Sequence, residues 1–303
     1  SAGYGIDENT GVRYLKLNRG YGGNTVPNGS TATMKMALLS LGQSADWTLD
    51  GGYTPNNNAA DLGDFYQWGR VADGHQNIVW NKDAYHINRT LPYGETPAYT
   101  SDTILYNANS LSYDPSTGQV EEGNYYGKFI NPSPPWYSWY NSYNYGLWGT
   151  ATGNNRATQG SLDFEWTYPA NNPCPLGWRI PSSWNWWDII DGNGSDTSFP
   201  DSKLISYFSF YNNTWQWRDD INNAAGGVIV TNKNGEKIFF SNMGWRHFEN
   251  LNGRGSPSLW SSTFKNNNNI FLVITSNDDL SFLGYNIINL GLCVRCVATE
   301  AEP

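Results

Sequence analysis

One stretch of this sequence restricts the backbone more than any other: Asn172-Pro173-Cys174-Pro175-Leu176-Gly177-Trp178-Arg179-Ile180-Pro181-Ser182-Ser183. Proline fixes φ and disfavours helix in the residue before it, so the segment from Cys174 to Pro181 is predicted to be extended. Ser182 is a suitable N-cap, because its hydroxyl can accept a hydrogen bond from a free N–H group of a first helical turn. Large apolar side chains then follow at helical spacing, at Trp184, Trp187 and Ile190. The stretch therefore predicts a strand, a sharp cap and a short tryptophan-rich helix.

Three further stretches belong with the first. They are Asp64-Phe65-Tyr66-Gln67-Trp68-Gly69-Arg70, Leu259-Trp260-Ser261-Ser262-Thr263 and Gly291-Leu292-Cys293-Val294-Arg295-Cys296-Val297. Taken in their order along the chain, the four stretches resemble motifs of the Fibrobacter succinogenes major paralogous domain. This is a family of bacterial cell-surface modules with a C-type-lectin-like fold. Two positions depart from the family pattern. Asn185 replaces the usual Glu of a capping box, which predicts a weaker cap, and Cys293 replaces a residue that is usually not cysteine.

The resemblance implies an α+β protein of C-type-lectin-like fold, with short antiparallel strands, few helices and long loops. We expect residues 1–303 to form one such domain, in which residues 60–298 are the family-like region. Residues 1–58 match the family least, so they are either a lead-in of the same domain or the remnant of a preceding module. Alternating apolar positions predict a strand over residues 12–17, whereas residues 33–41 fit either a strand or a short helix.

A β-hairpin is predicted in the second half of the chain. Two apolar segments, residues 228–231 and 237–240, flank Asn232-Lys233-Asn234-Gly235. The Asn-Gly pair supplies the turn chemistry of a tight hairpin.

The three cysteines allow two interpretations. Cys293 and Cys296 form a C-x-x-C pair, a spacing typical of redox and zinc sites. Their neighbours predict a strand, in which positions three apart point to opposite faces, and no second C-x-x-C is present to complete a zinc site. The family resemblance instead implies a disulfide between Cys174 and Cys296. Cys293 would then be a buried free thiol that packs as a small apolar side chain.

Composition narrows the classes of partner. Aromatic residues make up 16% of the chain and charged residues 15%, with a net charge of −9, so aromatic side chains must supply much of the core. The sequence has no basic cluster that could neutralise phosphates, and we therefore expect no nucleic-acid partner. No apolar run approaches the ~20 residues of a membrane-spanning helix. The aromatic, Asn-rich and Lys-poor composition favours an exported, extracellular protein of the bacterial cell surface.

The sequence lacks the common catalytic and metal-binding patterns. It has neither an H-E-x-x-H nor a G-x-S-x-G motif. The run Asp191-Gly192-Asn193-Gly194-Ser195-Asp196 opens like a calcium loop, but Gly at the sixth position and Glu at the twelfth are missing. We therefore expect no required metal ion, no cofactor and no enzymatic activity. The alternative is a glycosidase that uses a carboxylate pair drawn from Asp163, Glu165, Asp188 and Asp191.

Two segments carry side chains typical of binding surfaces. Residues 136–148 combine Tyr and Trp with Asn and Ser, as antibody paratopes do. Residues 264–289 precede the closing strand, and in related lectin-like proteins this segment can form the ligand-binding surface. We predict stacking contacts from Trp136, Trp139, Tyr140 and Tyr143, and directional hydrogen bonds from Asn267, Asn269, Asp278 and Tyr285. The alternatives are that these aromatic residues cover the core and that the second segment is an ordinary hairpin loop.

These observations lead to one main functional hypothesis and two alternatives. The main hypothesis is a non-enzymatic adhesin or ligand-binding module that recognises a glycan or a host or bacterial surface protein, alone or within a larger surface or pilus assembly. The first alternative is a carbohydrate-active enzyme of the glycoside hydrolase type. The second is a structural scaffold domain without a ligand of its own.

Overall fold

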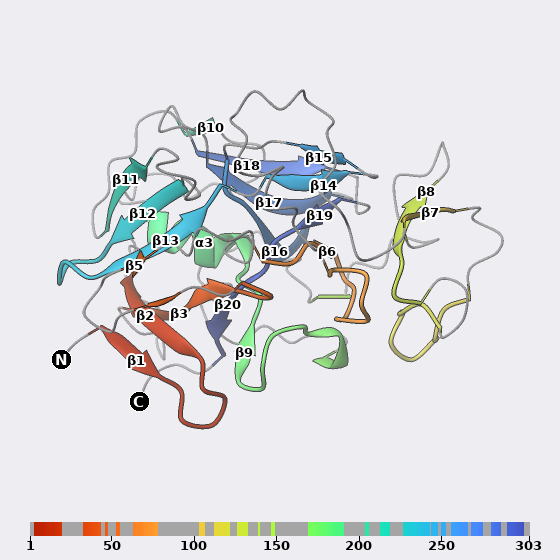
Figure 1. Ribbon diagram of the computed structural model, residues 1–303, viewed down its shortest axis with the longest axis horizontal. Coiled ribbons are helices and arrows are strands. Elements are labelled where there is room, and N and C mark those ends of the chain that lie inside the picture. Colours follow the sequence, from red (N-terminus) through yellow and green to blue (C-terminus); the bar gives the residue numbers. More distant parts are fainter. Residues whose placement is uncertain are drawn as a thin grey trace.

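The structure is a computed structural model that describes part of the chain. That part comprises residues 3–19, 33–43, 46–47, 53–54, 63–77, 103–106, 112–121, 126–132, 139, 147–148, 169–190, 204–205, 213–218, 227–242, 244–247, 250–252, 256–265, 268–274, 280–285 and 290–299. Small, mainly antiparallel β-sheets surround helix α3, which spans Ser183–Ile190 (Figure 1). The predicted class of short antiparallel strands with few helices is therefore confirmed. Within the described ranges, no helix is both long enough and apolar enough to span a bilayer.

A five-stranded antiparallel sheet joins the two ends of the sequence. Its order is β1-β2-β3-β20-β9, with bounds Tyr4–Ile6, Arg13–Asn18, Thr33–Ser40, Arg295–Ala298 and Trp178–Arg179. The strand expected over residues 12–17 is present as β2, and the ambiguous segment 33–41 is the strand β3. Because β3 pairs directly with β20, the lead-in and the closing stretch belong to one sheet.

The inner face of this sheet follows from alternation along β2 and β3. Leu15 and Leu17 are 0% exposed and pair across the ladder with Met36 and Met34. Successive residues of a strand point to opposite faces, so these four side chains lie on one side of the sheet. Full burial of each contributes about 2 kcal/mol of hydrophobic stabilisation.

The remaining strands form smaller sheets and pairs. Three strands form the order β11-β12-β13, namely Thr214–Arg218, Gly227–Thr231 and Lys237–Ser241. Four form β10-β18-β17-β16, namely Leu204–Ile205, Leu280–Tyr285, Asn268–Ile274 and Ser258–Lys265. Four more form β15-β14-β19-β6, namely Asn250–Asn252, Trp245–His247, Gly291–Leu292 and Tyr66–Gln67.

Two strand pairs and one 3₁₀ turn complete the described elements. β4 (Asp46–Trp47) pairs with β5 (Tyr53–Thr54), and β7 (Thr103–Tyr106) pairs in parallel with β8 (Phe129–Pro132). The 3₁₀ turn η3 covers Pro169–Asn171 and leads into the Cys174 stretch.

The predicted β12–β13 hairpin is confirmed, and one asparagine organises its turn. The Asn232 side-chain oxygen accepts hydrogen bonds from the backbone N–H groups of Asn234 and Glu236, each at 3.0 Å. Gly235 has φ +82°, a left-handed conformation that disfavours a side chain. The amide nitrogen of Asn232 also donates to the carbonyl of Lys16 at 3.0 Å, which attaches the hairpin turn to β2.

The strand, cap and helix of the Cys174 stretch form as predicted, and Asn185 completes the cap. The Ser182 hydroxyl accepts the backbone N–H of Asn185 at 3.1 Å, and the Asn185 side-chain oxygen accepts the backbone N–H of Ser182 at 2.9 Å. This is the reciprocal pair of a capping box, formed with asparagine in place of glutamate. The same oxygen accepts a hydrogen bond from Arg179 Nη1 at 2.8 Å, so the cap also fixes β9.

The disulfide between Cys174 and Cys296 is confirmed, with 6.0 Å between the Cα atoms. It links residues 122 positions apart and ties the Cys174 stretch to the closing strand. Cys293 is buried and takes no part in a disulfide, and Cys296 is bonded to Cys174, so the redox and zinc interpretations of the C-x-x-C pair are wrong. Burial raises the pKa of the Cys293 thiol well above its usual value, which keeps it protonated and unreactive.

Candidate functional site

Buried tryptophans connect the 64–70 motif, the 259–263 motif and the helix that follows the Cys174 stretch. The Trp68 indole N–H donates to the carbonyl of Ser261 at 2.9 Å, and the Trp260 indole N–H donates back to the carbonyl of Tyr66 at 2.6 Å. Trp186 of α3 donates to the carbonyl of Trp260 at 3.2 Å. All three tryptophans are 0% exposed, so each indole combines a large apolar contact with a satisfied polar group.

A buried arginine of the closing strand links two sheets. Arg295 donates to the carbonyls of Ala37 and Leu38 in β3 and to the carbonyl of Phe239 in β13. Its guanidinium carbon also lies 4.8 Å from the centre of the Phe240 ring. The pairing of β20 with β3 is irregular between Arg295 and Val297, at the point where this side chain reaches across.

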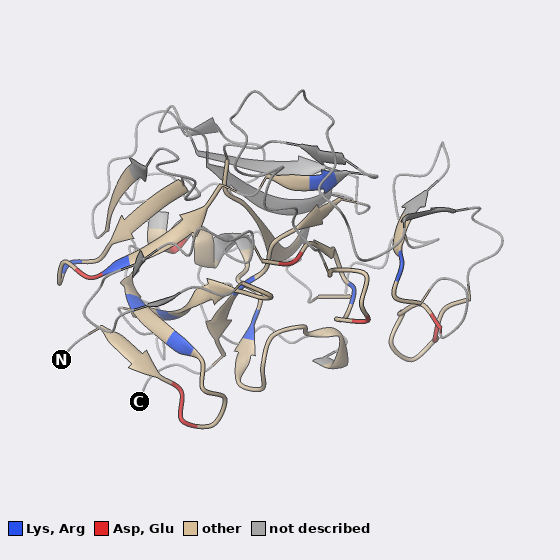
Figure 2. Cartoon of the chain, viewed as in Figure 1, with Lys and Arg blue, Asp and Glu red and all other residues tan. Residues whose placement is uncertain are grey.

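Much of the described positive charge lies inside the protein. Figure 2 shows lysines and arginines spread over several elements rather than gathered on one. Four arginines are among the largest fully buried side chains: Arg70, Arg179, Arg246 and Arg295. Burying a charge is costly unless it is hydrogen-bonded, so these residues indicate a fixed polar framework in the core.

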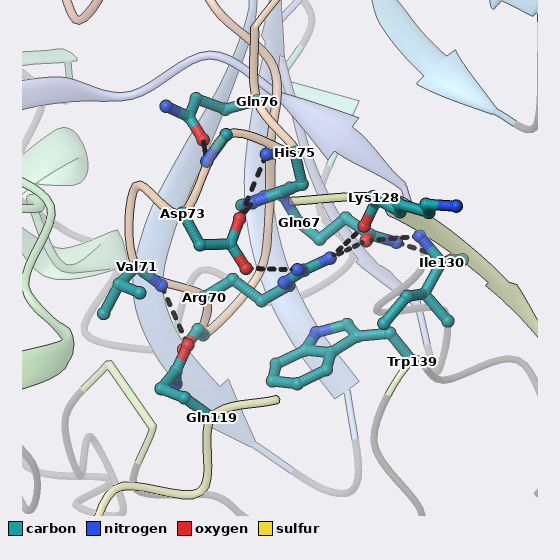
Figure 3. Close-up of polar contacts among 12 residues, drawn as sticks. Gln67, Arg70, Val71, Asp73, His75, Gln76, Gln119, Lys128, Ile130 and Trp139 are labelled. Carbon is teal, nitrogen blue, oxygen red and sulfur yellow. Dashed lines mark hydrogen bonds and ion pairs between the residues drawn. The ribbon is translucent and has the colours of Figure 1, made fainter. Parts of the chain in front are cut away.

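The densest part of this framework lies in the loop 63–77 that contains the Gln67-Trp68-Gly69-Arg70 motif (Figure 3). Arg70 Nη2 forms an ion pair with Asp73 Oδ2, and Asp73 Oδ1 lies 2.6 Å from His75 Nδ1. The backbone N–H of Gln67 donates to His75 Nε2 at 3.0 Å. Arg70, Asp73 and His75, here called the Arg70–Asp73–His75 cluster, therefore close the loop on itself.

These contacts define the protonation of His75. Nε2 faces a backbone donor and must be an acceptor, so the single proton lies on Nδ1 and is donated to Asp73. Burial, with the nearby Arg70 charge, lowers the pKa of His75 to about 4. Burial alone would raise the pKa of Asp73, but hydrogen bonding to His75 and the charge of Arg70 hold it below its usual value.

Asp73 and His75 resemble the Asp–His pair of a catalytic triad, but the His75 ring is not accessible to a substrate. A general base needs a free ring nitrogen within reach of a substrate proton. In this loop both ring nitrogens are engaged, Nδ1 with Asp73 and Nε2 with Gln67, and the ring is 0% exposed. The cluster therefore stabilises the conformation of the loop.

The same loop anchors the aromatic segment predicted to bind ligand. The Trp139 indole N–H donates to the carbonyl of Trp68 at 2.7 Å, and the Trp148 indole N–H donates to the carbonyl of Arg70 at 3.3 Å. The Arg70 guanidinium carbon lies 5.5 Å from the centre of the Trp139 ring. Glycine at position 69 lets Leu147 pack closely against the loop, because a Cβ there would lie 2.7 Å from the Leu147 side chain.

One predicted contact residue is therefore corrected. Trp139 is 0% exposed and offers no face to a ligand, because its indole is held inside by Trp68 and Arg70. Trp136, Tyr140 and Tyr143 lie outside the described residues. In the sequence, Tyr140 and Tyr143 fall between the two tryptophan anchors.

The second predicted segment coincides partly with a strand meander. β16, β17 and β18 are antiparallel neighbours, and Asn269 is paired directly with Tyr285. Two residues predicted to hydrogen-bond a ligand are thus brought together by the sheet register. Asn267 and Asp278 lie outside the described residues.

The described part of the chain accounts for one of the four carboxylates considered for a glycosidase. Asp188 is buried and forms an ion pair with Arg19 at 2.7 Å, which ties α3 to the end of β2. Asp163, Glu165 and Asp191 lie outside the described residues, as does the calcium-like run 191–196. Among described residues, no group of His, Cys, Asp or Glu has the arrangement needed to hold a metal ion.

Sequence reasoning did not identify the Arg70–Asp73–His75 cluster. Buried charges follow no hydrophobic periodicity, and Asp73 and His75 lie just beyond the recognised motif. The sequence signal was Arg70 itself, a charged residue at the end of a stretch rich in aromatic residues.

No protein-family model, curated protein or solved structure matches this chain. The functional assignment therefore rests on the geometry described above.

Proposed function

We propose that this protein is a non-enzymatic ligand-binding module of the bacterial cell surface, with a C-type-lectin-like fold, that recognises a glycan or a surface protein. The observation that carries the proposal is the double anchoring of the aromatic segment. Trp139 and Trp148 are fixed to two carbonyls of one buried loop. Attachment at both ends lowers the conformational entropy that a segment loses on binding, compared with the same segment unattached.

The residues between these anchors have the chemistry of a recognition surface. Tyr140, Tyr143 and Tyr145 alternate there with Asn141, Ser142 and Asn144. Tyrosine supplies rigid contact area, and asparagine and serine supply adaptable hydrogen bonds. Binding energy usually concentrates in a few such aromatic side chains.

A non-enzymatic role is supported by how the potentially reactive groups are used. His75 is engaged at both ring nitrogens, Asp188 is paired with Arg19, and the Cys293 thiol is buried with a raised pKa. Each group with catalytic potential in these positions stabilises the fold instead.

Export and the lectin-like fold are supported by two further observations. The Cys174–Cys296 disulfide is of a kind that persists in oxidising compartments outside the cytosol. The four motifs of the family resemblance, although far apart in sequence, each contribute a buried side chain to one hydrophobic core: Trp68, Trp178, Trp260 and Val294.

Binding arrays with matched variants test the proposal. The unmodified protein should bind a definable class of glycan or protein probe. Tyr140→Ala and Tyr143→Ala should weaken that binding by tenfold or more, since truncation of a true anchor costs ~2 kcal/mol. Tyr126→Ala is the matched control, because Tyr126 is 45% exposed and lies outside both predicted segments.

Two results would count against this function. The first is binding that Tyr126→Ala reduces as much as the Tyr140 and Tyr143 variants do. The second is turnover of a glycan probe by the purified protein, which would favour the glycosidase alternative.

A further inference from the structure

The loop 63–77 holds the strand β8 and the residue before it through two side chains. Gln67 Nε2 donates to the carbonyl of Ile130 at 2.8 Å, and the backbone N–H of Ile130 donates to Gln67 Oε1 at 3.0 Å. The glutamine amide therefore pairs with β8 much as a neighbouring strand would. Arg70 Nη1 adds a hydrogen bond to the carbonyl of Lys128 at 2.7 Å.

The loop also holds Trp139 and Trp148, as described above. Gln119 braces it from a third side, donating to the carbonyl of Gly69 at 2.8 Å and accepting from the backbone N–H of Val71 at 2.9 Å. Segments 126–132, 139 and 147–148 thus depend on one local backbone shape, which Figure 3 shows at its centre.

His75 maintains that shape from within. Its Nε2 accepts from Gln67, the residue that pairs with β8, and its Nδ1 contacts Asp73, the partner of Arg70. The backbone N–H of His75 also donates to Asp73 Oδ1 at 3.0 Å. One ring therefore links the backbone of Gln67 to Asp73, the ion-pair partner of Arg70.

We propose that His75 is an acid-sensitive latch. Protonation at Nε2 places a second N–H donor against the backbone N–H of Gln67, which opens the 63–77 loop. Opening then detaches β8 together with the Trp139 and Trp148 anchors. This inference concerns the chain without a ligand and does not require the proposed binding function, although it involves the same Trp139 and Trp148 anchors.

The charges around the ring give this response its direction. Within the described contacts, Arg70 and Asp73 face His75 from its own loop, Arg246 approaches from β14, and the Tyr66 ring meets it edge-on at 5.9 Å. Burial first, and then the positive charges of Arg70 and Arg246, oppose an imidazolium, whereas Asp73 favours it. The net effect lowers the pKa of His75 in the closed loop to about 4.

Acid favours the open form of the loop. In the opened loop the ring faces water and regains an ordinary pKa of about 6.5. Protons therefore bind the open form preferentially, and the open population should rise about tenfold per pH unit as the pH falls from about 6.5 to about 4. Above about pH 6.5 the latch stays closed and opening is independent of pH.

Hydrogen exchange measured at pH 7 and pH 4.5 tests the latch in the unmodified protein. After correction for intrinsic exchange rates, amides of residues 126–132 should open about a hundredfold more at pH 4.5, two pH units below the free imidazole value. Amides of the β12–β13 hairpin, which belongs to a different sheet from β6, should change far less. An equal change in both regions would mean global acid unfolding, and no change in residues 126–132 would mean that His75 is no latch. Either result overturns the proposal.

A matched pair of histidine variants isolates the responsible ring. His75→Gln keeps an acceptor for the Gln67 N–H but cannot be protonated, so the acid response of residues 126–132 should disappear. His86→Gln removes a different histidine and should leave the response intact. A response that persists in His75→Gln overturns the proposal.

A spectroscopic readout covers the case in which His75→Gln does not fold. Nuclear magnetic resonance of the unmodified protein should show the His75 ring signals changing together with the indole N–H signals of Trp139 and Trp148. A ring that becomes protonated while both indole signals stay unchanged would overturn the latch.

Discussion

At the scale of single residues, this protein uses polar atoms of large side chains to fasten its core. Each indole N–H of Trp68, Trp139 and Trp260 donates to a backbone carbonyl of a segment distant in sequence. Arg295 does the same with its guanidinium group. These side chains therefore carry both hydrophobic burial and specific pairing, so a substitution can remove one and leave the other.

Trp139 allows the two contributions to be separated. Trp139→Phe keeps most of the apolar volume but leaves the Trp68 carbonyl without this donor, which should lower the free energy of unfolding by ~1–3 kcal/mol. Trp139→Ala also empties a buried site and should cost ~3–5 kcal/mol. Urea denaturation measures both values, with the exposed-site variant Tyr126→Ala as the control. A loss below ~0.5 kcal/mol for Trp139→Ala, the range of surface substitutions, would place this residue at the surface after all.

Arg295 should not tolerate replacement by lysine. A lysine retains the charge but presents one compact donor group in place of the planar fork that reaches β3 and β13 together. We expect Arg295→Lys to lower the free energy of unfolding by ~2–4 kcal/mol, since a buried charge loses part of its pairing. Arg13→Lys, at an exposed position of β2, is the matched control and should change stability by less than ~0.5 kcal/mol. Equal losses in the two variants would show that the bridging geometry is unimportant.

At the scale of elements, local capping and turn chemistry determine where strands and the helix begin and end. Ser182 and Asn185 cap α3, and Asn232 shapes the β12–β13 turn. In both cases an asparagine side chain also bonds a neighbouring element, Arg179 of β9 in one and Lys16 of β2 in the other. Local motifs in this protein therefore also position elements relative to each other.

The α3 cap should show this dual role in a comparison of two variants. Ser182→Ala removes the hydroxyl acceptor and should cost ~1 kcal/mol, a typical value for an N-cap. Asn185→Ala removes the reciprocal bond and also the acceptor for Arg179 Nη1, so it should cost more, about 2–3 kcal/mol. Thermal or urea unfolding gives both values. If Asn185→Ala is no more destabilising than Ser182→Ala, the contact with Arg179 contributes little.

At the scale of the whole molecule, long-range links hold small sheets together. The sheet that contains β1 to β3 also contains β20 and β9, and the Cys174–Cys296 disulfide joins β20 to the segment that precedes β9. Many of the strands are only two or three residues long, so stability depends on connections between sheets more than on any one ladder.

The disulfide should be the largest single long-range contribution. It joins residues 122 positions apart, and in the chain-entropy model a loop of that length contributes about 4–5 kcal/mol. Cys174→Ser should lower the free energy of unfolding by that order. Mass mapping of non-reduced peptides should find the Cys174–Cys296 link and an unlinked Cys293. A variant as stable as the unmodified protein would show that packing alone fixes the closing strand.

The sequence by itself determined the local features: the extended Cys174 stretch, its helix, the β12–β13 turn and the strand β2. Each depends on interactions between near neighbours, such as proline φ, N-cap hydroxyls and the alternation of apolar residues. Through the family resemblance, it also identified the partner of Cys174. Only the tertiary structure decided that residues 33–41 are a strand, because pairing with β20 overrides their helical spacing. It also decided that Trp139 is buried and that Arg70, Asp73 and His75 form one cluster, since burial and charge pairing depend on segments that the sequence does not place side by side.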